Sequence, residues 1–391
     1  MTGVTGRTDI HDVAIVGAGP VGLTLALGLA RAGLDVVVLE REDGPGRHPG
    51  EALLWPGAQE VLHGLDLLER AQEKGISLVH PEVLDVDHDR VLLSVPLAEL
   101  SRETPCPHML FLPQSETVRL LYEEIRNTVG VEVQYATHVI DFVQDSFGVD
   151  VVCRRFGHEE RVRAKFVAGC DGAESSVRAH LGGTMEGRAR AMKLHVVDVC
   201  VPGCDDLAFP RFAGTPRPAL AVRLGEDLWR LVFPGFSRKE RKLAQRVGEA
   251  SRALFGKVHE ETVWSGEFRL ERRISSRWFN GRIVLAGDAA HVNSPVGGEG
   301  LNSGMGDAEL LTLALEQAVA VDHPQPLAEY VASRRRAVER VSLPFADMAL
   351  WLVFGGGSAR VRGWFACLRG LFFIPPLRRR IMRRMALMDR G

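Results

Sequence analysis

The chain of 391 residues lacks any run of about 18 consecutive apolar residues, so the sequence predicts no transmembrane helix. The first eleven residues are polar and contain no apolar stretch of a secretory signal, which predicts a cytoplasmic protein. The six cysteines form no C-x-x-C pair, which argues against a zinc site and favours reduced thiols. A formal net charge of −2 argues against nucleic acid as a partner.

The composition that remains is that of an ordinary globular protein, with 46% hydrophobic and 25% charged residues. The length allows a large core and two closely connected domains. Residues 12–40 have the pattern of a β-α-β unit: an apolar strand at 12–16, a helix at 21–33 and a second strand at 35–39. The order of these elements predicts a dinucleotide-binding fold.

The turn inside this unit reads GAGPVG and carries the glycines that such a site needs. Gly17 permits a tight turn, Gly19 lets the backbone approach a pyrophosphate, and Gly22 lets helix and strand pack closely. The phosphates would lie at the helix N-terminus, where backbone N–H groups are free. Glu40 follows the second strand, 23 residues after Gly17, and is placed to accept hydrogen bonds from an adenosine ribose.

A second chemical motif lies at 282–302, RIVLAGDAAHVNSPVGGEGLN. A short buried strand ends before Asp288, and a glycine-rich loop then opens a long helix at Gly300. Backbone without Cβ atoms can approach a flat ring, and a helix N-terminus presents free N–H groups and partial positive charge. This stretch therefore predicts a site for a ring that becomes an anion on reduction.

A third motif, Asp171-Gly172, follows a buried strand and precedes a helix start that carries Ser175, Ser176 and Arg178. The acid could simply cap that helix, but the DG pair with S-x-x-R spacing favours a binding role. Strand-like segments at 79–112 and 184–277 predict a second sheet. Helices are expected at 58–71, after Ser115 as N-cap, at 239–255 and at 327–350.

The C-terminal tail is basic and amphipathic, with RRRIMRRMALM near its end. Such a segment can lie on an anionic membrane surface. The alternative, which we favour, is a terminal helix that packs back onto the domain and exposes its arginines.

The three motifs, in this order, resemble those of the FAD-dependent aromatic hydroxylases, the para-hydroxybenzoate hydroxylase-like flavoprotein monooxygenases. The resemblance implies an α/β fold. A Rossmann-type FAD-binding domain would comprise 10–78, 113–183 and 278–322. An interleaved, mostly antiparallel substrate-binding sheet domain would comprise 79–112 and 184–277. A helical region would follow at 323–391.

The resemblance also implies roles for single positions. Arg41 would lie near adenine, Val139 would meet adenine through its backbone, and Arg47 and Gln114 would contact the central part of FAD. The cofactor-binding set it implies is Gly17, Gly19, Pro20, Val21, Gly22, Glu40, Arg41, Arg47, Gln114, Val139, Asp171, Gly172, Gly287, Asp288, Pro295, Gly298, Gly300, Leu301 and Asn302.

Within that set, Asp171-Gly172 is linked in the family to both FAD and NAD(P)H. Asp288 would bind the ribityl or pyrophosphate region, and Pro295 would stand near the reacting flavin carbon. The amides of Leu301 and Asn302 would face the pyrimidine edge of the ring. The family commonly has GGQGLN where this chain has Glu299. A carboxylate facing the flavin would oppose the reduced anion, so we expect Glu299 to point away.

The implied reaction uses NADH or NADPH to reduce FAD and O2 to form a flavin C4a-hydroperoxide, which hydroxylates the substrate. The second sheet is rich in Val, Leu, Phe and Trp, which favours an apolar aromatic or polyketide-like small molecule. His80, His108 and His195 are read as structural, so no catalytic base is assigned, and no metal is expected. The protein is expected to be a monomer or homodimer.

Three other functions share the nucleotide motif. A flavin-dependent halogenase usually carries W-x-W-x-I-P, which the six tryptophans here do not form. A geranylgeranyl-reductase-like enzyme is compatible with the apolar sheet and the basic tail. A non-catalytic binding protein, like the GDP-dissociation inhibitors, is disfavoured by the full set of FAD-contact positions.

Overall fold

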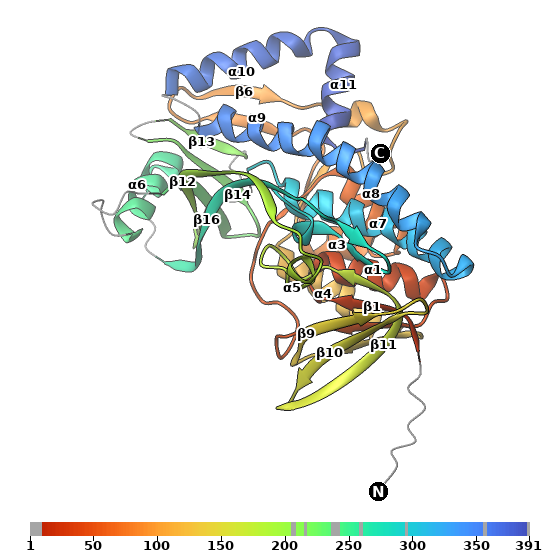
Figure 1. The fold of residues 1–391 in the computed structure, drawn as a ribbon. Helices are drawn as coiled ribbons and strands as arrows, with labels where there is room; N and C mark the ends of the chain where they lie inside the picture. The colour runs from red at the N-terminus through yellow and green to blue at the C-terminus, as the bar shows by residue number, and fades with distance from the viewer. Residues whose placement is uncertain are drawn as a thin grey trace, which may run out of the picture.

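The computed structural model describes residues 10–204, 209–214, 217–235, 243–257, 261–293, 296–354 and 358–388. Two large sheets and a set of long helices make up these residues (Figure 1). The mixed α/β architecture expected from the sequence is confirmed. Among the helices described, none is both long and apolar enough to cross a membrane.

The first sheet has a parallel centre with the strand order β18-β11-β1-β2-β8. These strands are β1 (His11–Val16), β2 (Val36–Leu39), β8 (Val131–Gln134), β11 (His158–Gly169) and β18 (Ile283–Leu285). Three further strands, β9 (Thr137–Gln144), β10 (Val149–Arg155) and β17 (Phe279–Asn280), add antiparallel pairings.

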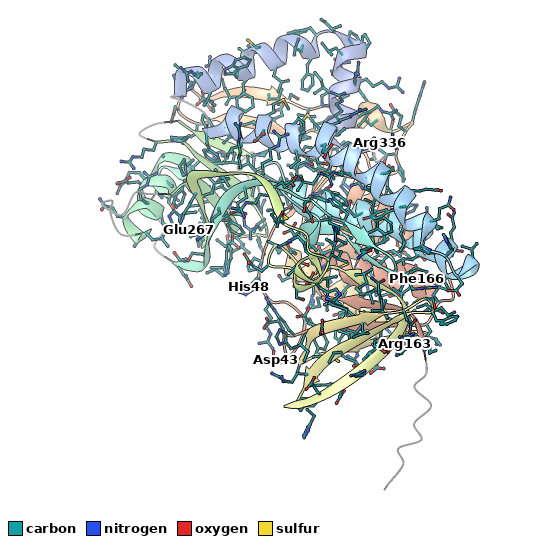
Figure 2. All side chains as sticks on the ribbon, in the orientation of Figure 1. Asp43, His48, Arg163, Phe166, Glu267 and Arg336 are labelled. Atoms are coloured by element: carbon teal, nitrogen blue, oxygen red, sulfur yellow. The ribbon has the colours of Figure 1, made fainter. Side chains whose placement is uncertain are left out.

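The long strand β11 serves two parts of this sheet. Its first half pairs with β10 and is largely exposed, whereas its end at 166–169 is fully buried beside β1. Figure 2 labels Arg163 in the half-buried middle of the strand and Phe166 at the start of its buried end. The buried end carries the chain to Asp171, at the carboxyl edge of the parallel strands.

Strand β1 shows why both faces of the parallel centre are covered. Val13 and Ile15 pack into one core cluster with the helices, and Ala14 and Val16 pack into another on the opposite face. Helix α1 (Pro20–Arg31) is apolar all round because the sheet covers one side while α4 (Gln114–Ile125) and α7 (Glu299–Val321) cover the other. Fully burying one of its leucines contributes about 2–3 kcal/mol.

The second sheet has the order β19-β16-β12-β15-β14-β13-β5-β6. Its pairings among the described residues are antiparallel except for β13 with β5, so the expected mostly antiparallel sheet is present. Its strands are β5 (Glu82–Asp85), β6 (Arg90–Ser94), β12 (Met185–Cys200), β13 (Arg211–Ala213), β14 (Ala219–Arg223), β15 (Leu228–Pro234), β16 (Thr262–Ser275) and β19 (His291–Val292). Helix α6 (Leu243–Phe255) packs against β13, β14 and β15.

Short elements connect the two sheets. A three-stranded sheet joins β3 (Leu53–Leu54), β4 (Ile76–Leu78) and β7 (Met109–Phe111). The remaining short elements are the 3-10 turns η1 (Leu97–Leu100) and η2 (Gly287–Ala289) and the helix α5 (Ser176–His180). Strand β19 follows η2 directly, so the chain passes from the first sheet into the second at the predicted ring-binding stretch.

Helix boundaries correct several expectations. The helix expected at 58–71 is two helices, α2 (Pro56–Gly64) and α3 (Leu68–Lys74), because Asp66 between them adopts a left-handed conformation with φ of 50°. Ser115 is not an N-cap, because α4 begins at Gln114 after Pro113. Of the helix expected at 239–255, residues 239–242 lie outside the described residues.

The helix expected at 327–350 is also divided. It comprises α8 (Gln325–Ala337), a π-helical turn η3 (Val338–Ser342) and α9 (Leu343–Phe354). A π turn inserts one residue into the helical repeat, which periodicity of apolar residues does not reveal.

The C-terminal helices pack back onto the second sheet, as the favoured alternative predicts. These helices are α10 (Ser358–Phe372) against β6 and α11 (Pro375–Met385) against η1. Met382 is fully buried between them and the sheet. Arg378 pairs with Glu99, and Arg383 pairs with Glu103. The basic stretch therefore has an acidic partner surface within the same chain.

Candidate functional site

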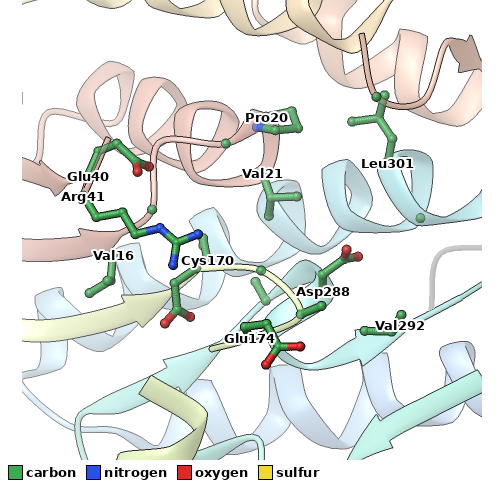
Figure 3. A pocket seen from close by; sticks show the side chains of 18 of the residues that line it. Val16, Pro20, Val21, Glu40, Arg41, Cys170, Glu174, Asp288, Val292 and Leu301 are labelled. Carbon is green, nitrogen blue, oxygen red and sulfur yellow. The ribbon is translucent and has the colours of Figure 1, made fainter. Parts of the chain in front are cut away.

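A groove of about 940 Å³ runs along the carboxyl ends of the parallel strands and faces β16 of the second sheet. Figure 3 shows Glu40 and Arg41 toward one end of it, Leu301 toward the other and Asp288 between them. The predicted cofactor positions that line it are Gly17, Gly19, Pro20, Val21, Glu40, Arg41, Gln114, Val139, Asp171, Gly172, Asp288, Gly300 and Leu301.

The other predicted positions lie elsewhere. Arg47 is exposed and does not line the groove, and Gly22 lies beneath the turn in helix–strand packing. Gly287 and Asn302 are in supporting positions, whereas Gly298 lines a neighbouring pocket. Pro295 lies outside the described residues.

The first turn is built so that only glycine fits at two of its positions. Gly17 has φ of +104°, and a Cβ there would lie 2.5 Å from the carbonyl oxygen of Cys170. A Cβ on Gly22 would clash with the carbonyl oxygen of Gly17. Gly19, by contrast, has open space around its Cα and is the N-cap of α1 without a side-chain cap. Its open backbone and the free N–H groups of α1 fit a pyrophosphate.

Glu40 is held at the end of β2 by the same turn. Its carboxylate accepts hydrogen bonds from the amide of Ala18 at 2.6 Å and from that of Glu42 at 3.0 Å. Arg41 beside it is two-thirds exposed and lies 3.3 Å from the carboxylate of Glu42. Glu40 is therefore held in place by backbone contacts, whereas Arg41 is exposed at the edge of the groove.

Asp171 has the helix-capping role that the sequence left as an alternative. Its carboxylate accepts hydrogen bonds from the amide of Ser176 at 2.7 Å and from that of Val177 at 3.2 Å, and from the hydroxyl of Ser175 at 2.5 Å. Gly172 follows with φ of +80°. Because both residues also line the groove, capping and ligand contact are compatible here.

Asp288 lies on a turn that is anchored by a buried ionic network. The amide of Gly287 donates to Asp307 at 2.9 Å, and Asp307 also bonds to His291 at 2.7 Å and to Arg334 at 2.8 Å. Burial by itself would raise the pKa of Asp307, but the charges of His291 and Arg334 lower it to about 2. The network therefore holds a carboxylate under the turn.

Asp288 itself reaches into the groove. Enclosure by the protein raises the pKa of its carboxyl, and the neighbouring His291 opposes that rise. The supporting residues were absent from the sequence-based site. His291 lies within the 282–302 motif but was given no role there, whereas Asp307, 16 residues later, and Arg334, a further 27 residues on, belong to no motif.

The N-terminus of α7 is occupied by a carboxylate that the sequence reading missed. Glu51 accepts a hydrogen bond from the amide of Leu301 at 2.9 Å. Burial raises the pKa of Glu51 to about 7, against the lowering effect of the Leu301 amide. In the sequence, Glu51 is one of several polar residues in the loop 41–57. That loop has no regular pattern that would distinguish Glu51 from the others.

The side chain of Asn302 connects this helix to the residues around strand β3. Its side-chain oxygen accepts from the amide of Trp55 at 2.7 Å, and its nitrogen donates to the carbonyl of Leu53 at 2.6 Å. Gly298 precedes the helix with φ of +70°. Asn302 thus fixes how the glycine-rich turn sits against the loop that carries Glu51.

Glu299 points away from the groove, as expected from its charge. It is fully buried, lines neither cavity, and both of its carboxylate oxygens lack hydrogen-bond partners in the part of the chain that the structure describes. Burial, and then the nearby Glu51, raise the pKa of Glu299 well above its ordinary value. A neutral acid has the shape and donor capacity of the glutamine that is common at this position.

A smaller apolar pocket of about 120 Å³ adjoins the groove and shares Gly50, Glu51 and Phe268 with it. Its walls come mainly from β12, β14 and β15, with Val296 and Phe354. Arg230 and Glu51 are the charged residues among the described residues that line it. Arg230 bonds to Asp198 at 2.7 and 2.9 Å and to the carbonyl of Gly50.

The three histidines near the second sheet do not line either cavity. His108 bonds to Gln72 at 3.0 Å, and burial lowers the pKa of His108. His195 packs against Phe233, and burial likewise lowers the pKa of His195. These contacts agree with the structural reading of His108 and His195.

Comparison with known proteins identifies the cofactor. The sequence profile of the family described as "FAD binding domain" matches residues 11–343. Among curated proteins, 6-hydroxy-3-succinoylpyridine 3-monooxygenase HspB of Pseudomonas putida is 30% identical and covers 86% of this chain and 87% of its own. Para-nitrophenol 4-monooxygenase of Pseudomonas sp. (strain WBC-3) is 28% identical and covers 90% of both chains.

The chain belongs to the FAD-dependent aromatic hydroxylase family. Among solved structures, p-nitrophenol 4-monooxygenase PnpA of Pseudomonas putida DLL-E4 superposes with a TM-score of 0.88 at 26% identity, covering 96% of this chain and 98% of that one. The chain is therefore an FAD-dependent monooxygenase, as the sequence predicts. A Diels-Alderase from pyrroindomycin biosynthesis, PyrE3, has the same fold with a TM-score of 0.78 at 25% identity.

Replacing Glu299 by glutamine should stabilise this flavoprotein above neutral pH. A raised folded-state pKa means that Glu299 favours the folded state at low pH and that this contribution is lost as pH rises. We expect Glu299→Gln to raise the melting temperature by about 2–4 °C at pH 8 and to have little effect at pH 5. Thermal melts of the FAD-loaded protein measure both, with the exposed Glu316→Gln as control. Equal effects at both pH values would contradict a buried neutral acid.

Proposed function

We propose that this monooxygenase uses NADH or NADPH to hydroxylate an apolar aromatic or polyketide-like small molecule. The observation that carries the proposal is the junction of the two cavities, where an apolar pocket opens onto the α7 end of the groove. The substrates after which two relatives are named, para-nitrophenol and 6-methylpretetramide, support this class. The second of these relatives, from Streptomyces rimosus, is 30% identical, and the match covers 97% of this chain and 69% of that protein.

The proposed placement of FAD follows the groove from end to end. Glu40 and Arg41, with Val139, would hold the adenosine, and the turn at Gly19 would hold the pyrophosphate. Gln114, Asp171-Gly172 and Asp288 would contact the middle. Gly17, Pro20, Val21, Gly300 and Leu301 complete the proposed lining of the cofactor site. Gly22, Gly287 and Asn302 would support it from outside the groove, and Arg47, Pro295 and Gly298 stay predicted contacts. FAD supplies the redox chemistry. The protein holds the cofactor in position, excludes water from the site and provides charged groups.

The N-terminus of α7 suits a ring that gains negative charge. Its backbone amides at Gly300 and Leu301 donate to Glu51 beside the groove, and the helix dipole adds partial positive charge at this end. Burial raises the pKa of Glu299, next in the chain, which favours its uncharged form. The pocket beside it is walled by aliphatic and aromatic side chains, which exclude water from a bound substrate ring.

The sheet topology supports the proposed division of the chain. We propose that 10–78, 113–183 and 278–322 form the cofactor domain and that 79–112 and 184–277 form the substrate domain, followed by the helical region 323–391. Strand β5 pairs with β13, more than a hundred residues away, and β6 pairs with β5, which places the first inserted segment in the second sheet.

Oxygen insertion tests the proposed activity. The FAD-loaded protein is incubated with NADH or NADPH and a panel of phenols under isotopically labelled O2. We expect at least one phenol to accelerate NAD(P)H oxidation and to yield a product that carries one labelled oxygen atom. Product formation without label, or without NAD(P)H, would instead indicate a non-oxygenating reaction such as that of the Diels-Alderase relative.

Replacing Asp288 by alanine should weaken FAD binding. Loss of a charge-assisted hydrogen bond costs about 1.5–3 kcal/mol, which corresponds to about a 10- to 100-fold rise in Kd. Fluorescence titration of the apoprotein with FAD measures this change. The exposed Glu69→Gln on α3 is a matched control. Unchanged affinity in Asp288→Ala would remove Asp288 from the proposed site.

The proposal also covers where in the cell the protein works and what it associates with. We infer a cytoplasmic monomer or homodimer that can touch an anionic membrane through the end of its C-terminal region. Phe373 and Ile374 are exposed between α10 and α11, and Arg380 is exposed on α11. We expect co-sedimentation with vesicles that contain phosphatidylserine at low salt, and reduced co-sedimentation of Phe373→Ser. Equal recovery with neutral vesicles would contradict the contact.

A further inference from the structure

Glu51 lies where the FAD groove and the apolar pocket meet. It lines both cavities, and only Gly50 and Phe268 share that property among the described residues. The loop that carries it is fixed on two sides: the amide of Glu51 donates to the side chain of Gln114, and Arg230 bonds to the carbonyl of Gly50. The carboxyl group is therefore held at the boundary between the cofactor and a bound substrate.

The surroundings of this carboxyl balance its two protonation states. From α7, the amides of Leu301 and Gly300 favour the charged form, and the buried carboxyl of Glu299 lies close by. From η2, the carboxylate of Asp288 disfavours it. From β15, the guanidinium of Arg230 favours it. Burial is the largest influence and raises the pKa of Glu51 to about 7, in the range where a carboxylate both accepts and releases protons.

We propose that Glu51 is the acid–base residue that accepts the proton of a ring hydroxyl on the substrate. The proposal rests on the proposed function, because it requires a phenolic ring in the apolar pocket. The O–H bond of the phenol breaks, an O–H bond forms on the Glu51 carboxylate, and the electron pair stays on the ring oxygen. The resulting phenolate is richer in electrons and reacts more readily with an electrophilic oxygen. The proton then leaves to water through the groove.

The neighbouring charged groups do not fill this role. Asp288 lines the groove but not the apolar pocket, and Glu299 lines neither. Arg230 lines the pocket, but a guanidinium remains protonated and its bonds to Asp198 hold it in place. Arg230 instead supplies positive charge that stabilises the phenolate after Glu51 has taken the proton.

Spectroscopy of a bound phenol tests the proposal without turnover. The FAD-loaded protein is titrated with 3-nitrophenol, whose pKa lies above that of Glu51, in the absence of NAD(P)H, and difference spectra record the absorption of the phenolate. At a pH between the two pKa values, where Glu51 is mostly ionised and the free ligand mostly neutral, we expect binding to the unmodified protein and to Glu51→Asp to generate phenolate. Glu51→Gln should bind the ligand in its neutral form. The control Glu69→Gln should behave as the unmodified protein does.

Kinetics with a phenol that is hydroxylated gives the second measurement. We expect Glu51→Gln to lower kcat by about 100-fold and to lose the acidic limb of the pH–rate profile, at unchanged FAD occupancy. Phenolate formation or near-normal kcat in Glu51→Gln would overturn the proposal. Loss of FAD in step with loss of activity would also overturn it, because Glu51 would then only support the cofactor site. Absence of labelled oxygen in every product of the unmodified protein would instead refute the proposed function.

Discussion

The geometry of the site depends on one buried carboxylate, that of Asp307. A charge without solvent must be paired, and this one is paired with His291 and Arg334 while it also accepts the amide of Gly287. These partners come from η2, from β19 of the second sheet and from α8. A single anion therefore joins the end of the parallel strands, the start of the second sheet and the helical region beneath Asp288.

Close backbone approach is the second constraint on the groove. Where Gly17 passes Cys170 and where Gly22 passes Gly17, no space remains for a side chain. At Gly19 the space is open on the groove side, so free amides are exposed to a ligand. The same glycines thus pack one side of the turn tightly and leave the other side accessible, which is what an extended dinucleotide requires.

Acidic groups are concentrated at the end of the groove that would hold a ring gaining negative charge. Asp288, Glu51 and Glu299 would repel such a ring if all three were ionised. Burial raises the pKa of each carboxyl, and Glu299 is removed from the cavity surface altogether. Enclosure by the protein therefore reduces the negative charge near the α7 N-terminus and leaves Glu51 able to exchange a proton.

The sequence by itself determined the elements whose cause is local. The GAGPVG turn, the strand before Asp171 and the glycine-rich start of α7 follow from backbone rules that act over a few residues, and the family followed from their order. Segments in which apolar and polar residues alternate, together with short apolar runs, likewise indicated two sheets. Helix interruptions at Asp66 and in η3 were missed, because one left-handed residue or one π turn barely changes the apolar pattern.

Only the tertiary structure decided which side chains share the site and in what state of charge. The side chain of Asn302 connects β3 to α7, and Glu51, read as part of a polar loop, lies at the α7 end of the groove. Asp307, His291 and Arg334 meet under Asp288 although no motif links them. Pairing, burial and pKa depend on distances between segments that are remote in the chain, and those distances are properties of the folded molecule alone.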